Sequence, residues 1–222
     1  MSAARMGLLA PLAAAAMVVL SPMGPGPLGG GGAAEAASFD CAKAANASEV
    51  AICSDPTLSA LDGRLQASFD ARVARDAKLR QIERGWILAR NAGCDKDVAC
   101  LTRFTRAEIA WLQSAAVGLP SRLPTQEGAC ALTTIRQVGS RLEGMPDSGS
   151  AVAETDGGYQ VSYDVIPAIT ASQRGDPTLL CLISIPRHCP RGDTRGRIYS
   201  AANLRTLGAW SEADAEHSCV GA

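Results

Sequence analysis

The chain has 222 residues, a formal net charge of −1, and 47% hydrophobic but only 4% aromatic residues. This balanced charge gives no indication of nucleic-acid binding, and the core must be filled mainly by aliphatic side chains. The length allows one or two domains.

The first 36 residues have the order of a secretory signal peptide. Arg5 gives a cationic start, an apolar run of about fourteen residues covers 7–20, and Ala34 and Ala36 are the small residues that a signal peptidase recognises. A membrane-spanning helix needs about 20 apolar residues. We therefore predict a signal peptide over 1–36 and a product without membrane insertion.

All cysteines follow this predicted cleavage site, and their even number favours disulfides in an oxidising compartment. They are Cys41, Cys53, Cys94, Cys100, Cys130, Cys181, Cys189 and Cys219. The alternative is a zinc site, since His188 and His217 lie beside or near two of them. The sequence has no Cys-x-x-Cys pair, so we favour disulfides and expect no metal and no cofactor.

Arginine outnumbers lysine by 18 to 3, which is typical of GC-rich bacterial genomes. We therefore expect a periplasmic or secreted protein.

The hydrophobic periodicity of residues 37–119 predicts a helical domain. Apolar residues recur at spacings of three and four from Leu58 to Trp86, which indicates one long helix over 57–92 with Asp55 as its cap and Pro56 in its first turn. A second helix over about 97–116 would complete an antiparallel hairpin. Trp86 lies on the apolar stripe, which favours a core position over a binding anchor.

Residues 120–128 are expected to be a linker, and the pattern after it changes to that of strands. Residues 158–165 alternate, residues 179–185 are an apolar β-rich run, and turns are indicated at 156–158 and Gly208. We predict a small all-β domain over 129–222, an antiparallel sheet or barrel of about five strands. The fold class is therefore α+β, with a disulfide-stapled helical hairpin followed by this domain.

Reach along the chain restricts the disulfide pairing. A helix over 57–92 would be about 54 Å long, whereas the bridged Cα atoms of two cysteines lie within about 7 Å. This favours Cys41 with Cys53 and Cys94 with Cys100. For the other four cysteines three pairings exist, and we prefer Cys130–Cys181 and Cys189–Cys219 because a bridge between 181 and 189 would be tight.

The helical part resembles the LprI-like lysozyme-inhibitor domain family over about 38–112. The resemblance is carried by Cys41-Ala42-Lys43-Ala44, Glu49 to Cys53, Leu58 to Asp62, Trp86, Arg90, Cys94 and Cys100-Leu101. The chain departs from the family's pattern at Glu83-Arg84-Gly85, where a glutamine is expected nearby. The resemblance implies an exported helical protein that binds lysozyme or another envelope protein. Of the charged motif residues, Glu49, Asp62 and Arg90 could form either this partner surface or an internal polar network.

A second hypothesis concerns the arginines between residues 187 and 205. Arg187, Arg191, Arg195, Arg197 and Arg205 could hold an anionic polymer of the envelope, because arginine forks match oxyanions. The alternative is a solvated loop that balances nearby acids.

The sequence does not indicate an enzyme. It contains no nucleophile elbow, no His-Glu-x-x-His and no phosphate loop, and its thiols are expected to be oxidised. We therefore predict a non-catalytic binding protein.

Overall fold

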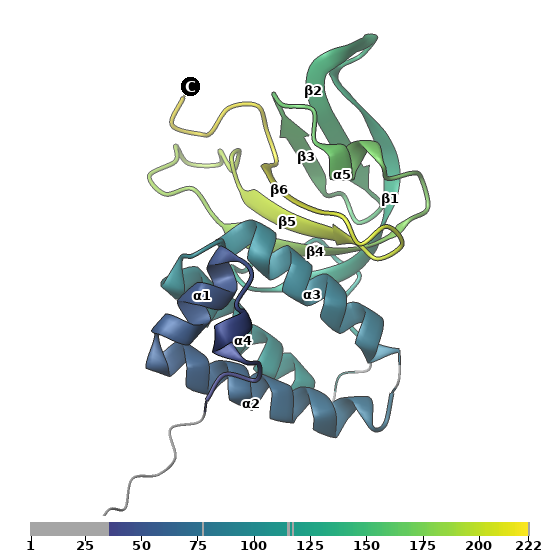
Figure 1. Ribbon diagram of the computed structural model, residues 1–222. Coiled ribbons are helices and arrows are strands. Elements are labelled where there is room, and N and C mark those ends of the chain that lie inside the picture. Colours follow the sequence, from purple (N-terminus) through teal and green to yellow (C-terminus); the bar gives the residue numbers. More distant parts are fainter. Residues whose placement is uncertain (1–35, 77, 115, 117, 222) are drawn as a thin grey trace, which may run out of the picture. The chain divides into compact units, whose positions relative to one another are not determined.

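The computed structural model describes residues 36–76, 78–114, 116 and 118–221, which belong to one compact unit. The predicted signal peptide lies almost entirely outside these residues. The helices are α1 (Ala47–Ser54), α2 (Pro56–Val73), α3 (Leu79–Cys94), α4 (Val98–Gln113) and the short α5 (Pro167–Thr170), preceded by a 3₁₀ turn, Cys41–Lys43. The strands are β1 (Cys130–Leu142), β2 (Met145–Glu154), β3 (Tyr159–Ser162), β4 (Pro177–Ser184), β5 (Ile198–Asn203) and β6 (Ala209–Ala213). The mixed helical and antiparallel β class is as predicted (Figure 1).

The prediction of one long helix over 57–92 is wrong. The chain leaves the helix after Val73 and starts α3 at Leu79, where Asp76 accepts hydrogen bonds from the backbone N–H groups of Lys78 and Leu79. The break has a packing reason: α2 lies mainly against α4, whereas α3 lies on strands β4, β5 and β6. A continuous helix would have directed both segments along one axis.

Helix α3 approaches the strands closely because its inner face is made of small residues. Gly85, Ala89 and Gly93 are spaced by four, so they lie along one side of the helix. A Cβ atom added at Gly93 would lie 2.3 Å from Ile183 Cδ1 on β4. Close contact therefore requires glycine here, and a shared hydrophobic core joins the helices to the outer face of the strands.

The six strands form a closed barrel in the order β1-β2-β3-β6-β5-β4. β1 closes it because it is long enough to pair twice: residues 130–134 pair with β4, and the residues from Ile135 on pair with β2. β4 is buried along nearly its whole length because one face points into the barrel and the other toward α3. This explains why its sequence is a continuous apolar run rather than an alternating one.

The barrel interior is filled by side chains that include Ile135, Leu182, Tyr199 and Trp210, with Ile169 of α5 beside them. Gln160 satisfies two of the polar groups here: Trp210 Nε1 donates to its side-chain oxygen (2.9 Å), and its amide donates to the Tyr199 carbonyl (2.7 Å). The barrel is therefore a packed core.

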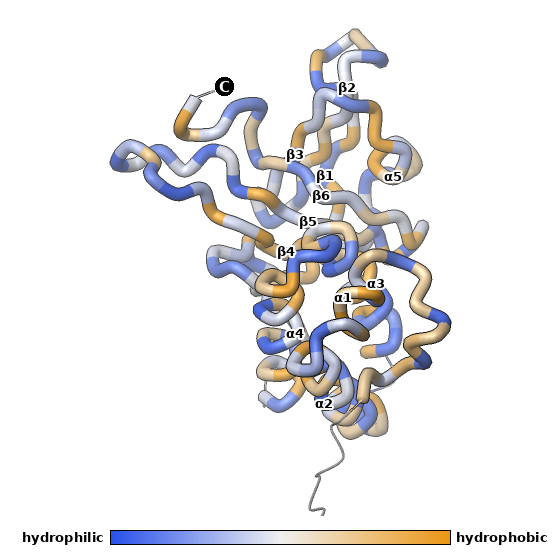
Figure 2. Tube along the Cα trace, turned by 60° about the vertical axis from the view of Figure 1, so that its left-hand side comes forward, coloured by the Kyte–Doolittle hydropathy of each residue, from blue (hydrophilic) through white to orange (hydrophobic). Residues whose placement is uncertain are grey.

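Four disulfides join Cys41 to Cys53, Cys94 to Cys100, Cys130 to Cys181, and Cys189 to Cys219, in the pairing that the sequence favours. The third bridge links β1 to β4 at the closure of the barrel. The fourth pins the connection between β4 and β5, which is largely hydrophilic (Figure 2), to the C-terminal segment.

Candidate functional site

A groove of about 710 Å³ lies between the start of α3 and the barrel. Its apolar lining comes from Ile82, Leu132, Pro177, Leu204 and Leu207, and its polar lining from Lys78, Arg80, Gln81, Arg84 and Arg205. We call this set the α3 groove. Gln81 fastens the helix to the barrel, because its amide donates to the Leu204 carbonyl (2.9 Å). Among the described residues that line it, the groove combines apolar walls with four cations and no carboxylate.

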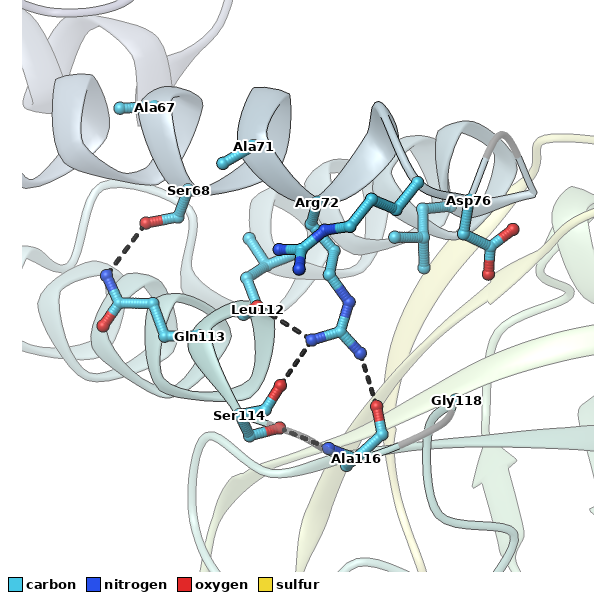
Figure 3. Close-up of a pocket in the computed structure, with 12 residues that line it drawn as sticks. Ala67, Ser68, Ala71, Arg72, Asp76, Leu112, Gln113, Ser114, Ala116 and Gly118 are labelled. Carbon is cyan, nitrogen blue, oxygen red and sulfur yellow. Dashed lines mark hydrogen bonds between the residues drawn. The ribbon is translucent and has the colours of Figure 1, made fainter.

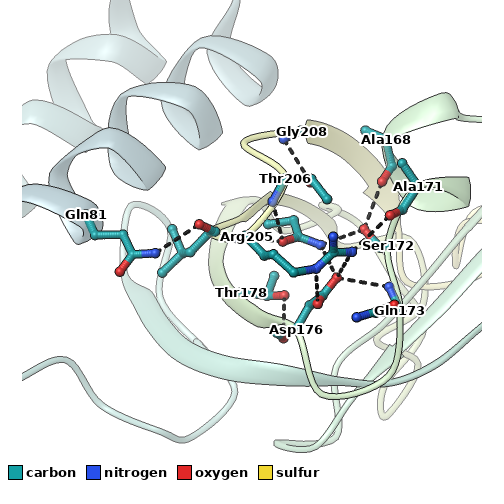
Figure 4. A network of polar contacts seen from close by, with 12 residues as sticks. Gln81, Ala168, Ala171, Ser172, Gln173, Asp176, Thr178, Arg205, Thr206 and Gly208 are labelled. Atoms are coloured by element: carbon teal, nitrogen blue, oxygen red, sulfur yellow. Dashed lines mark hydrogen bonds and ion pairs between the residues drawn. The ribbon is translucent and has the colours of Figure 1, made fainter.

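Arg205 forms one side of this groove and is held in place by a buried acid (Figure 4). Its Nη2 lies 2.8 Å from Asp176 Oδ2, and its Nε donates to Oδ1 of the same carboxylate. Asp176 is 3% exposed and also accepts from Asn203 (2.7 Å) and from the Gln173 N–H (3.0 Å). Hydrogen bonds from Arg205 hold the pKa of Asp176 well below its usual range. The guanidinium of Arg205 is therefore already bound by a carboxylate of the protein itself.

The structure does not bring the five predicted anion-binding arginines together. Arg205 is separated from Arg197 by the length of β5, which is about 20 Å for six residues. Arg195 pairs with Asp193 (2.7 Å), and Arg197 is half-buried near Tyr199. Arg187 and Arg191 are exposed on the connection between β4 and β5.

The predicted residues of the helical part are divided between two places. Glu49 lies at the start of α1, where its carboxylate accepts from the Ala45 N–H (2.6 Å). Asp62 and Arg90 are buried, 5% and 4% exposed, and their charged atoms are 3.8 Å apart. Asp62 also accepts from the N–H (2.9 Å) and hydroxyl (2.6 Å) of Ser38. These two side chains are thus internal, and Trp86 (2% exposed) lies in the shared core.

Sequence reasoning missed a pair of carboxyl groups next to Asp62 and Arg90. Glu108 is fully enclosed, and burial raises its pKa well above the usual range, with a further contribution from the nearby Glu83. Burial also raises the pKa of Glu83. The sequence held one indication that Glu108 is buried. It lies seven residues after Leu101 and four before Leu112, so it falls on the otherwise apolar stripe of α4.

Another buried carboxyl lies in the barrel, where the sequence reasoning placed no site. Glu154 ends β2 opposite Ile135 and is 1% exposed, and neither carboxylate oxygen has a hydrogen-bond partner among the described residues. Burial, assisted by the charge of Asp156, raises the pKa of Glu154 to about 8.

The hairpin of β1 and β2 extends beyond the rest of the barrel (Figure 1). Pairing of β2 with β3 stops at Ser150, whereas pairing of β1 with β2 continues to Leu142 and Met145. Arg141 braces this extension: it donates to the Ser148 carbonyl (2.8 Å), pairs with Glu216 (3.4 Å) and lies over the Tyr163 ring at 4.3 Å. The tip exposes Leu142 (39%) and Met145 (57%).

A further hollow of about 780 Å³ lies between the ends of α2 and α4 (Figure 3). The guanidinium of Arg72 lines this hollow and donates hydrogen bonds to the carbonyls of Leu112, Ser114 and Ala116. Arg72 thereby caps the C-terminal end of α4. We assign this hollow a structural role.

Within the described ranges no group of three or more His, Cys, Asp or Glu side chains is arranged to hold a metal ion. In the same part of the chain, no helix is both long and apolar enough to cross a membrane. The fold and these sites define a disulfide-rich α+β protein with a closed antiparallel barrel. Comparison with known proteins finds no matching family model, no matching curated protein and no matching solved structure. The LprI-like resemblance therefore stays a prediction.

Proposed function

We propose that this protein is an exported, non-catalytic binding protein that recognises lysozyme or another envelope protein through the projecting β1–β2 hairpin. Its disulfides fit an oxidising compartment, and the braced hairpin is the observation on which the proposal rests. The partner surface predicted from the family resemblance, Glu49, Asp62 and Arg90, is replaced in this proposal because two of these residues are buried.

The hairpin suits insertion into a cleft for three reasons. It projects past β3, and Arg141 of β1 ties it to Ser148 across the hairpin and to Glu216 outside it. Its tip offers apolar area in Leu142 and Met145 that the fold does not use. A preorganised loop of this kind loses little conformational entropy on binding. A lysozyme carries its catalytic acids in such a cleft, so a hairpin lying there would block access of the substrate.

The test is inhibition of lysozyme by the processed chain, produced in an oxidising compartment. We expect inhibition to fall when Leu142→Asp and Met145→Asp are combined, because a buried contact would receive unpaired charges. Val50→Asp is the matched control, since Val50 is equally exposed (52%) but lies on α1. No inhibition of hen-type or goose-type lysozyme at micromolar excess would refute lysozyme as the partner. Capture of an envelope protein that is insensitive to the double variant would refute the hairpin assignment.

The second candidate is an envelope module that holds an anionic polymer through the Arg-rich loop. Fewer residues support it than the sequence indicates. Of the five predicted arginines, only Arg187 and Arg191 are both exposed and without an ion pair among the described residues. Salt-sensitive binding to isolated envelope that Arg187→Ala with Arg191→Ala abolishes would favour it over the hairpin proposal.

A further inference from the structure

The α3 groove differs from the hairpin and from the Arg-rich loop in its chemistry. Three of its cations, Lys78, Arg80 and Arg84, are exposed and have no carboxylate within ion-pair distance in the described part of the chain. The fourth, Arg205, is neutralised by Asp176. The groove therefore keeps an uncompensated positive charge along one side.

Two of the cations stand at the start of their helix. α3 begins at Leu79 with no acidic residue in its first turn, and Lys78 at the cap makes no side-chain hydrogen bond. The Asp76 carboxylate accepts from the Lys78 N–H (3.0 Å) and supplies one negative charge at this end. Arg80 lies in the first turn and Arg84 one turn later on the same face, so both side chains line the groove.

The opposite wall carries an independent irregularity, at Leu207. This residue has a positive φ of 60° in the turn between β5 and β6, a conformation that glycine and asparagine adopt more readily than leucine. Its side chain is nevertheless 45% exposed and lines the groove. An exposed apolar side chain held in a strained backbone conformation contributes nothing evident to the core, which is consistent with a contact to a ligand.

The floor between the two walls is apolar. Leu204 is buried, and Leu132, Pro177 and Ile82 are half-buried around it. A purely ionic ligand such as a free phosphate would leave this surface in water, whereas a neutral apolar ligand would leave the cations unused.

We propose that the α3 groove binds an anionic single-chain amphiphile, with its phosphate or carboxylate head at Lys78, Arg80 and Arg84 and its acyl chain along Leu132, Leu204 and Leu207. Charge complementarity selects the head group, and the apolar floor selects the chain. This site is separate from the proposed function and does not depend on it.

Binding is tested with three probes by calorimetry on the full processed protein, below the critical micelle concentration. The probes are dodecyl phosphate, inorganic phosphate as the head alone, and dodecyl maltoside as the same chain with an uncharged head. We expect dodecyl phosphate to bind at least about tenfold more tightly than either of the others. Equal binding of inorganic phosphate would overturn the role of the chain, and equal binding of dodecyl maltoside would overturn the role of the cations.

Two variants locate the site. Arg80→Ala with Arg84→Ala should weaken dodecyl phosphate binding at least about tenfold, whereas Arg64→Ala with Arg106→Ala removes the same charge from exposed positions elsewhere and should leave it unchanged. Leu207→Asn should weaken binding while the Tm stays the same or rises, because asparagine tolerates a positive φ. Unchanged affinity in Leu207→Asn, or equal losses in both arginine pairs, would overturn the assignment.

Discussion

Glu154 makes a strong prediction about the pH dependence of stability. This carboxyl is 1% exposed inside the barrel and has a pKa of about 8 against an ordinary value of 4.5. The folded state therefore holds a proton that the unfolded chain has lost. Its contribution to stability is fully present below the unfolded pKa and is lost as the pH rises toward 8.

The magnitude follows from the one-proton difference between the two states. Between the two pKa values the free energy of unfolding falls by about 1.4 kcal/mol per pH unit from this group, or about 3 kcal/mol from pH 5 to pH 7. Glu154→Gln keeps the shape of the protonated side chain but cannot ionise. Between pH 5 and pH 7 the free energy of unfolding of this variant should therefore fall by about 3 kcal/mol less than that of the native protein.

The assay is urea unfolding at several pH values with the disulfides intact. The difference between variant and native protein cancels the other titrating groups, including Glu108, and leaves only the contribution of Glu154. Glu143→Gln, at the exposed hairpin turn, is the control and should follow the native pH dependence. Parallel pH profiles of Glu154→Gln and the native protein would refute the reasoning.

Three further substitutions test the packing by the free energy of unfolding. Gly93→Ala should destabilise by about 1–2 kcal/mol, because overpacking against β4 exceeds the helix propensity gained, and a stabilised variant would contradict the close approach of α3. Gly149→Ala should lower the free energy of unfolding far more than Gly139→Ala does. An added Cβ would lie 2.1 Å from a β3 carbonyl at the first position and in open space at the second. Similar free energies of unfolding for both variants would be incompatible with the observed register. Asp62→Asn should lower the free energy of unfolding by about 3 kcal/mol, because it removes the buried carboxylate that lies 3.8 Å from Arg90 and, among the described residues, leaves only Glu83 and Glu108 near that charge. A loss below about 1 kcal/mol would contradict a stabilising role of the pair.

Local signals along the chain predicted much of the fold. The period of apolar residues separated helices from strands near Pro124, and Asp55 and Gly208 marked real boundaries because capping and turn preferences depend on neighbouring residues alone. The disulfide pairing agrees with the prediction, although the unbroken helix over 57–92 that favoured the first two pairs is not formed.

The candidate sites were less accessible, because they depend on contacts between distant segments. The α3 groove joins the start of α3 to a turn more than a hundred residues away, and no pattern in either segment indicates the other. The predicted arginines show the converse: Arg197 and Arg205 are close in sequence, but β5 runs between them and holds them apart.

The sequence by itself determined the oxidised cysteines, the order of helices and strands, and the apolar residues available for the core. Only the tertiary structure decided that the helix breaks near Asp76, that β1 closes a barrel, and that Glu108 and Glu154 are buried. Propensities and turn signals act over a few residues, whereas burial and desolvation are properties of the assembled core.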